Sequence, residues 1–300
     1  MIQPINISRE QFPKSNVKSD GMITLNICCD NSSMEYIPDI EYINRDGISL
    51  YIQLILPYDR TENTPLVIYV PGSAFRWQNV KRVIPSISLL ANRGFAIAMV
   101  QYRGSEVSPF PAQMLDTKAA VRFMKNNAHK YGLNPDNVYL MGDSSGGHTA
   151  LMAGLTAGIE KFEEEIYSEV SSSVKGIIDL YGPTDITKMN DELSSLSHIE
   201  PDSPEGCLIG GFNVLEHPEL TGPTVVMNYI DSAREIPPIL IFHGTNDELV
   251  PFGQSCMLYD KLVKCNKKAT FYAIDNAHHG GREFWSNQVL DIMEEFIKKV

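Results

Sequence analysis

The stretch VYLMGDSSGGHTALM, residues 138–152, places two serines among glycines where a strand is expected to meet a helix. VYLM is a short apolar run typical of a buried strand, and the segment from His148 onward is apolar at helical spacing. Between them, Gly142, Ser144 and Gly146 match the pattern G-x-S-x-G. In that pattern a sharp turn lifts the central side chain above the sheet, and small residues on either side let the backbones pack closely. The stretch therefore predicts a strand, a tight turn carrying a reactive serine, and a helix.

The spacing of the glycines selects one serine. Centring the pattern on Ser144 puts glycine at both required positions, whereas centring it on Ser145 puts Asp143 where a glycine is needed. We predict Ser144 as the nucleophile, and the backbone amide of Ser145, at the helix start, as a donor to an oxyanion. The alternative is a glycine-rich turn without chemistry.

Apolar strands alternate with helices along most of the 300 residues, which predicts one large α/β domain. An Asp46-Gly47 turn predicts an antiparallel hairpin within 40–57. Further strands are expected at 65–70, 95–102, 138–141, 174–182, 237–244 and 269–274, and helices at 84–94, 116–132, 252–265 and 284–300. The pattern predicts a mostly parallel sheet of about eight strands, with helices on both faces.

We divide the chain into an N-terminal extension, residues 1–37, and a catalytic domain, residues 38–300. Residues 185–236 interrupt the alternation with mixed polar, Gly and Pro content. So long a connection between two core strands is typical of a lid or pocket wall.

Two loops that follow core strands supply candidate partners for Ser144. A serine hydroxyl needs a histidine base, and that imidazole needs a carboxylate to orient it and to stabilise its charged form. Asp247 follows the expected strand 237–244, with Glu248 as the rival acid. The adjacent His278 and His279 follow the last strand, and neighbouring loop residues point different ways, so at most one is expected to meet Ser144. A metal site at the two histidines is the weaker interpretation, because no Cys or carboxylate lies at helpful spacing.

A loop after the strand 65–70, PGSAFRW, is the fourth element. The oxyanion needs a second amide from a loop after an early strand, where small residues let the backbone approach the substrate. Ser73 and Ala74 are the candidates, and Phe75 and Trp77 are expected to wall a pocket. The alternative is an ordinary Pro-Gly turn.

Composition excludes some functions. Lys and Arg number 25 against 37 Asp and Glu, a formal charge of -12 that argues against nucleic acid or an anionic membrane as a partner. The first 20 residues lack the pattern of a signal peptide, so we expect a cytoplasmic location. The five cysteines lack metal-ligand spacing, and the adjacent Cys28 and Cys29 are interpreted as reduced packing residues. We expect neither a metal nor another cofactor.

With these elements in order, the chain resembles the α/β-hydrolase superfamily, and more closely its feruloyl and acetyl esterase-like branch, which includes carbohydrate esterases and hormone-sensitive-lipase relatives. The resemblance covers roughly residues 38–300. Its blocks are YRGSEVSPFPAQMLDTKAAVRFMKNNAHKYGLNPDNVYLMGDSSGGH, DLYGPTDI, SPEGCLIGG, HGTNDELVP and AHHGGREFW. In this branch the base precedes a glycine, which implies His279 as the base and leaves His278 as a flanking residue. Pro71-Gly72-Ser73-Ala74-Phe75 aligns with a His-Gly-Gly-Gly-aromatic loop of this branch and departs from it at Pro71, Ser73 and Ala74. Ser73 and Ala74 keep the backbone N–H groups that such a loop donates. Four further residues in matching segments are interpreted as structural: Asp116, His148, Asp185 and His243.

The resemblance implies a serine esterase with Ser144, Asp247 and His279 as the catalytic triad. It also implies a small-molecule ester as the substrate: a short-chain or aromatic acyl ester, for example one on a plant-derived oligosaccharide. Two alternatives remain open. A peptidase of the prolyl-oligopeptidase type shares the catalytic order, but usually carries a large propeller, for which the roughly 60 residues before the core leave no room. A non-catalytic hydrolase fold used for binding would typically have lost one of the three residues.

Overall fold

The computed structural model describes residues 3–27 and 33–300, so Cys28 and Cys29 lie outside the described residues. The contacts divide the chain into a segment that ends at residue 31 and a compact unit from residue 32 to residue 300. Within the first segment, one turn of 3-10 helix, Arg9–Gln11, is formed, and its side chains are exposed.

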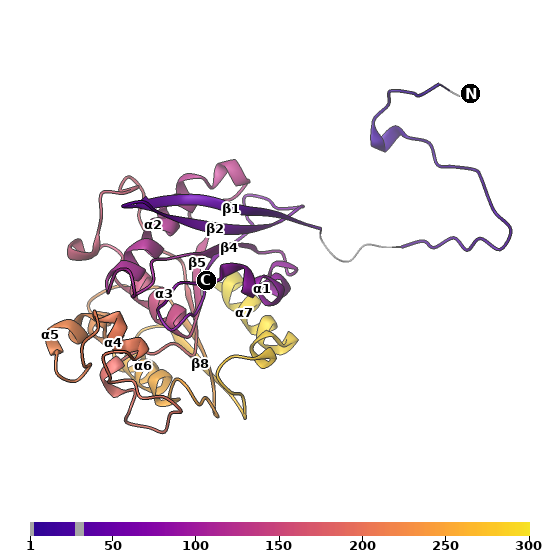
Figure 1. The fold of residues 1–300 in the computed structure, drawn as a ribbon. Coiled ribbons are helices and arrows are strands. Elements are labelled where there is room, and N and C mark those ends of the chain that lie inside the picture. The colour runs from indigo at the N-terminus through magenta and orange to yellow at the C-terminus, as the bar shows by residue number, and fades with distance from the viewer. Residues whose placement is uncertain (1–2, 28–32) are drawn as a thin grey trace. The chain divides into compact units, whose positions relative to one another are not determined.

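The compact unit is built on an eight-stranded sheet with the strand order β1-β2-β4-β3-β5-β6-β7-β8 (Figure 1). The strands are β1 (Met34–Arg45), β2 (Ile48–Pro57), β3 (Leu66–Val70), β4 (Ala96–Val100), β5 (Val138–Asp143), β6 (Ile177–Leu180), β7 (Ile239–Gly244) and β8 (Ala269–Ile274). The pairs β1–β2 and β2–β4 are antiparallel, and the other pairs are parallel. The expected mostly parallel sheet with an N-terminal hairpin is confirmed.

Helices cover both faces of this sheet. The helices of the compact unit are α1 (Ile84–Ala91), α2 (Ala112–Asn126), α3 (Ser145–Leu155), α4 (Pro204–Leu208), α5 (Pro218–Thr221), α6 (Gly253–Lys264) and α7 (Asn287–Lys299), and α4 and α5 lie within residues 185–236. Shorter 3-10 helices are Val80–Val83, His129–Tyr131, Glu160–Phe162, Ile186–Lys188, Gly222–Thr224, Val226–Tyr229 and Arg282–Trp285. Successive strand residues point to opposite faces. Ile68 accordingly lies in the cluster that includes residues of α2, α3 and α6, whereas Val67 lies in the cluster that includes residues of α1 and α7.

The hairpin starts earlier than the sequence pattern indicated, at Met34 rather than Ile40. Pro38 lies within this first part of the strand. Proline has no N–H for a sheet ladder, so its presence argued against a strand here, although edge strands and bulges accept it. The register of β1 against β2 shifts between Ile37 and Ile40, and Asp39 has a φ of 51°. The strand therefore continues through a bulge that the sequence pattern does not indicate.

Candidate active site

The turn between β5 and α3 holds Ser144 in a strained conformation. β5 ends at Asp143, α3 begins at Ser145, and Ser144 between them has φ 53° and ψ -129°. Side chains other than glycine rarely adopt a positive φ, and such strain is concentrated at functional sites. The turn follows the carboxyl end of β5. Ligands of parallel sheets bind at the carboxyl ends of the strands, so Ser144 lies at the edge of the sheet where a ligand is expected.

The glycines on either side of Ser144 are required by close packing. A Cβ built on Gly142 would lie 2.2 Å from the carbonyl oxygen of Gly146, and one on Gly146 would lie 2.1 Å from that of Val70. Both distances are far shorter than van der Waals contact, so a methyl group at either position would force the turn open. Glycine is therefore required at both positions because the neighbouring backbone leaves no room for a side chain.

The structure brings Ser144, His279 and Asp247 together from three separate segments. The Nε2 atom of His279 lies 2.9 Å from the Oγ atom of Ser144. Its Nδ1 atom lies 2.8 Å from the Oδ2 atom of Asp247. A carboxylate can only accept, so Nδ1 carries the hydrogen, and Nε2 is left to accept the proton of the serine hydroxyl.

Asp247 is fixed by four donors. Its Oδ1 atom accepts the backbone N–H groups of Leu249 and Val250, both at 2.9 Å. The Nε2 atom of His243 lies 3.2 Å from its Oδ2 atom, close to the bond from His279. Burial would raise the pKa of Asp247, but the hydrogen bonds from His243 and His279 outweigh burial and hold this pKa well below its ordinary value. The carboxylate therefore stays charged at neutral pH.

His243, which the sequence analysis interpreted as structural, contacts the carboxylate of Asp247 directly. It is fully buried, and its Nδ1 atom lies 2.7 Å from the Oγ atom of Ser255. Its Nε2 atom lies 3.0 Å from the carbonyl oxygen of Val250, which can only accept, so Nε2 carries a hydrogen. Sequence reasoning missed this contact with Asp247. The separation of four residues was visible, but the way in which the chain turns between them was not.

His278 and Glu248 form a second pair beside the first. The Nδ1 atom of His278 lies 3.1 Å from the Oε2 atom of Glu248, and both side chains are largely exposed, at 69% and 49%. Glu248 also accepts the backbone N–H of His279 at 3.3 Å. The acid on the imidazole of His279 is therefore Asp247, and the rival Glu248 binds the backbone and the neighbouring histidine.

The loop after β3 lies against the turn that carries Ser144. The backbone N–H of Gly72 donates to the Oδ1 atom of Asp143 at 2.8 Å, and the hydroxyl of Tyr69 donates to the same atom at 2.6 Å. A Cβ on Gly72 would lie 2.8 Å from that of Ser144, so only glycine allows this approach. Burial raises the pKa of Asp143, although the bonds from Tyr69 and Gly72 oppose the effect.

Two amides of this loop differ in their availability. The N–H of Ser73 already donates to the Oγ atom of Ser145 at 2.9 Å. The N–H of Ala74 has no acceptor within residues 3–27 and 33–300, and the same holds for the N–H of Ser145. Ala74 and Phe75 have φ values of 55° and 61° inside a tight turn, closed by a 3.1 Å bond from Arg76 N–H to Ser73 O. The loop thus accommodates side chains at positions where the resembling family has glycine, at a cost in backbone strain.

A cavity of about 710 Å³ opens over Ser144 and His279. Both tryptophans of the chain, Trp77 and Trp285, line it, and Tyr181 packs edge-on against the imidazole of His279 with 4.8 Å between ring centroids. Polar side chains complete the lining: Gln78, Asn79, Arg82 and Ser86. Sequence reasoning missed Tyr181, Arg82 and Trp285, because only the fold brings their segments to the cavity.

The expected pocket-wall role of Phe75 needs correction. Its side chain is 1% exposed and is absent from the lining of the cavity. It packs edge-on against His148 with 5.3 Å between ring centroids, because the positive φ of Phe75 turns the ring into the core. Trp77, in contrast, is 47% exposed at the cavity.

The other three residues that the sequence analysis interpreted as structural, His148, Asp185 and Asp116, bind groups outside the line from Ser144 to Asp247. The Nε2 atom of His148 lies 2.9 Å from the carbonyl oxygen of Thr224, and burial lowers the pKa of His148 to about 4. Asp185 caps a 3-10 helix by accepting the N–H of Thr187 at 3.0 Å. Asp116 forms ion pairs with two arginines of neighbouring segments.

Two kinds of feature are absent from the described part of the chain. Within residues 3–27 and 33–300, no cluster of three or more His, Cys, Asp or Glu side chains is placed to hold a metal ion. No helix in those ranges combines the length and the apolar character needed to cross a membrane.

Comparison with solved structures supports the fold. A structure described as a truncated form of carbohydrate esterase from gut microbiota superimposes with a TM-score of 0.80 and 28% sequence identity, covering 90% of this chain and 96% of that one. An acetyl ester-xyloside bifunctional hydrolase from Caldicellulosiruptor lactoaceticus gives a TM-score of 0.72 at 19% identity, covering 89% of this chain and 96% of that one. The second likeness bears on the fold alone. Together with the sheet topology, these structures establish an α/β-hydrolase fold.

Comparison of sequences leads to a family. The probable carboxylic ester hydrolase LipM of Mycobacterium tuberculosis (strain ATCC 25618 / H37Rv) is 27% identical over 224 residues, covering 72% of this chain and 48% of LipM. The isoprenylcysteine alpha-carbonyl methylesterase ICME of Arabidopsis thaliana is 26% identical over 235 residues, covering 76% of this chain and 53% of ICME. The chain thus spans about half the length of these relatives. The BD-FAE family model matches residues 52–262, most of the chain, and the chain therefore belongs to the BD-FAE family.

Proposed function

We propose that this chain is a serine carboxylic-ester hydrolase that works through an acyl-enzyme. The observation that carries the proposal is the hydrogen-bonded line from Ser144 through His279 to Asp247, with distances of 2.9 and 2.8 Å. In this proposal Ser144 attacks the ester carbonyl while Nε2 of His279 takes its proton. Asp247 holds the imidazole in the required tautomer and stabilises its charged form.

Two backbone amides are proposed to bind the oxyanion. The amide of Ser145 begins α3, where the helix dipole favours negative charge. For the second donor we choose Ala74 over Ser73, because the Ser73 amide is already engaged with the Ser145 hydroxyl. His279 then gives its proton to the departing alcohol and activates a water molecule that hydrolyses the acyl-enzyme.

The proposed substrate is a short-chain or aromatic acyl ester of a sugar. Aromatic side chains offer flat apolar faces with polar edges. Trp77 and Trp285 lie in the cavity together with polar side chains that could meet hydroxyl groups. A carbohydrate esterase among the structural relatives is in line with this choice.

We also propose that residues 185–236 form a lid or pocket wall. The hydroxyl of Ser194 donates to the carbonyl oxygen of Leu249 at 3.0 Å, and Leu249 lines the cavity. The lining itself contains no residue of 185–236 in the part of the chain that the structure describes, so the segment would act through Leu249.

A panel of esters tests these proposals. Wild type and Ser144→Ala are compared on p-nitrophenyl acetate, butyrate and octanoate, methyl ferulate and acetylated xylo-oligosaccharides. We expect turnover that vanishes in Ser144→Ala, with the sugar acetates or the ferulate preferred over the octanoate. Turnover of prolyl peptide anilides instead would favour the peptidase alternative, and a folded protein without any turnover would favour the binding alternative.

A further inference from the structure

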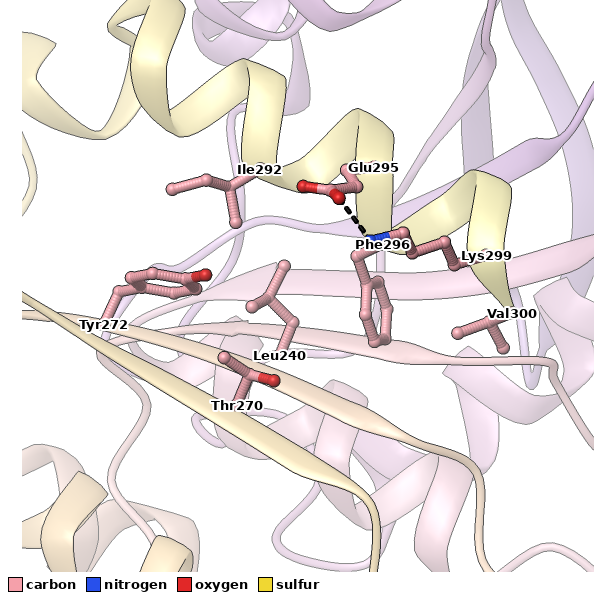
Figure 2. Close-up of a pocket in the computed structure, with 8 residues that line it drawn as sticks. All are labelled: Leu240, Thr270, Tyr272, Ile292, Glu295, Phe296, Lys299 and Val300. Carbon is pink, nitrogen blue, oxygen red and sulfur yellow. Dashed lines mark hydrogen bonds and ion pairs between the residues drawn. The ribbon is translucent and has the colours of Figure 1, made fainter.

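The cavities outside the active site differ in whether their polar side chains have partners. Figure 2 shows the hollow between β8 and α7, where Leu240, Ile292 and Phe296 contribute apolar side chains. Lys299 in this hollow forms an ion pair with Glu295 of the same helix. The charged groups of this hollow therefore bind each other and give no indication of a ligand.

A different cavity, of about 400 Å³, adjoins the one over Ser144. Trp77, Gln78 and Asn79 line both, so the two cavities meet along these residues. Trp77 is 47% exposed, and its backbone N–H donates to the Oε1 atom of Glu106 at 2.9 Å. A large flat ring therefore lies at the junction, on a loop that Glu106 holds in place.

This adjoining cavity is lined by a buried amide that lacks a partner. Gln101 is 8% exposed, and its side chain makes no hydrogen bond within the described part of the chain. Gln53 lines the same cavity, but its amide is bound by the hydroxyl of Tyr36 at 2.6 Å and donates to Asp39 at 2.9 Å. Leaving a buried polar group unpaired costs free energy, so the amide of Gln101 needs an explanation. A ligand in the cavity would supply the missing partner.

Two more polar side chains of this cavity have no partner among the described residues. They are the hydroxyl of Tyr51, on β2, and the side-chain amide of Asn79. Hydroxyl and amide groups both donate and accept hydrogen bonds. The charged groups of the lining, Asp39 and Lys81, pair with each other at 2.9 Å, so the cavity carries no unpaired charge for an ionic ligand. The lining therefore fits a neutral ligand with many hydroxyl groups.

The bulge in β1 places Asp39 at this cavity. Asp39 has a φ of 51° and lies where the register of β1 against β2 shifts. Its backbone N–H donates to the Oε1 atom of Gln53 at 3.2 Å, and its carboxylate accepts from the same amide. Bulges of this kind re-aim a side chain and are over-represented next to active sites. The bulge thus shapes the wall opposite the sheet end of the cavity's polar lining.

We propose that this cavity is a sugar subsite, formed by Tyr51, Trp77, Asn79 and Gln101, that binds a second ring of a neutral oligosaccharide. The inference rests on the proposed function, because it takes the ester group over Ser144 to be carried by a sugar chain. One ring of that chain packs on the flat apolar face of Trp77. The two amides and the hydroxyl of Tyr51 bind the hydroxyl groups of this ring.

Isothermal titration calorimetry with unesterified sugars tests the sugar subsite without any turnover. Wild type is titrated with xylotetraose, cellotetraose and mannotetraose, and with the three corresponding single sugars. We expect at least one tetraose to bind with a Kd of about 1 mM or tighter, and at least about tenfold more tightly than its single sugar. The proposal is overturned if no tetraose binds at about 20 mM, or if tetraose and single sugar bind equally.

Two variants remove polar groups of the sugar subsite while keeping most of their bulk. Gln101→Leu should weaken binding of that tetraose about tenfold and Tyr51→Phe about fivefold, because each loses hydrogen bonds to the sugar. Tyr58→Phe makes the same change at a 74% exposed tyrosine that lines neither cavity, and it should have no effect. The melting temperature of Gln101→Leu should not fall, because its amide has no partner to lose. Unchanged binding in both subsite variants would overturn the proposal.

Ester assays separate this proposal from the one on which it rests. For an acetylated form of the tetraose, kcat/KM of Gln101→Leu should fall about tenfold further than for p-nitrophenyl acetate, which carries no sugar to reach the subsite. Turnover of p-nitrophenyl acetate without tetraose binding would overturn the sugar subsite alone. Tetraose binding without turnover of any ester would overturn the esterase and keep the cavity as a sugar-binding site.

Discussion

Two histidine–carboxylate pairs lie side by side in this molecule, formed by adjacent residues of the same two loops. His279 and Asp247 are buried, with side chains 13% and 0% exposed, whereas His278 and Glu248 are 69% and 49% exposed. Only the buried pair reaches Ser144. An ion pair in water is weak and mobile, whereas a buried carboxylate with fixed donors holds its partner in one orientation. Burial, more than residue type, separates the candidate base from its neighbour.

The largest difference between the two pairs is expected when each histidine is replaced by alanine. His279→Ala should lower kcat for p-nitrophenyl acetate by on the order of 10⁵, because the serine loses its base. His278→Ala should stay within about threefold of wild type, since an exposed pair contributes little. Steady-state kinetics of both variants measures the difference. Equal losses would remove the assignment of His279 as the base.

The two acids form the next test. Asp247→Asn should lower kcat by about 10⁴, because an amide can favour the wrong tautomer of His279. Glu248→Gln should change kcat by about twofold at most, since Glu248 binds only the exposed histidine and a backbone amide. The same ester assay provides the measurement. A large loss in Glu248→Gln together with an active Asp247→Asn would reverse the roles.

The free energy of unfolding should depend on the charge of Asp247. The folded pKa of Asp247 lies below its unfolded value of 3.8, so its charge stabilises the fold above that pH and the stabilisation is lost as the pH falls below it. Asp247→Asn should therefore lower the free energy of unfolding by about 2 kcal/mol at pH 7, and the gap to wild type should narrow from pH 4 downward. Urea unfolding at several pH values tests this. A gap that stays constant down to pH 2 would contradict it.

The smallest expected effect concerns His243, the second histidine that contacts the carboxylate of Asp247. His243→Ala should lower kcat about tenfold with little change in KM, because Asp247 loses one of its fixed donors. His243→Gln, which keeps a donor near the same position, should lose less. An unchanged kcat in His243→Ala would show that the other three donors suffice.

The sequence predicted the parts of the site that depend on local geometry. Gly142 and Gly146 allow one tight turn, so their spacing alone is enough to single out Ser144. The Asp46-Gly47 turn and the apolar strand runs predicted the sheet for the same reason. The structure places Asp247 and His279 at the ends of β7 and β8 as expected, while their catalytic roles stay predictions.

The parts that sequence reasoning missed depend on tertiary packing. Tyr181 and Trp285 reach the cavity only because the strand order brings their segments to Ser144. Phe75 was expected at the cavity surface, yet its positive φ turns it toward His148. A backbone conformation that is unusual for a residue type leaves no trace in periodicity, so such positions need a structure.

The positive φ of Ser144 has a consequence for engineering the heat resistance of this chain. Glycine adopts that conformation without a clash, so Ser144→Gly should relieve strain of about 1 to 3 kcal/mol, offset in part by the greater freedom of glycine in the unfolded chain. A more heat-resistant protein obtained by random selection for folding alone would therefore tend to lose its serine. With Ser144 as the proposed nucleophile, folding and reactivity favour different residues at this position, so selections for thermal tolerance in this scaffold need an activity screen at every round.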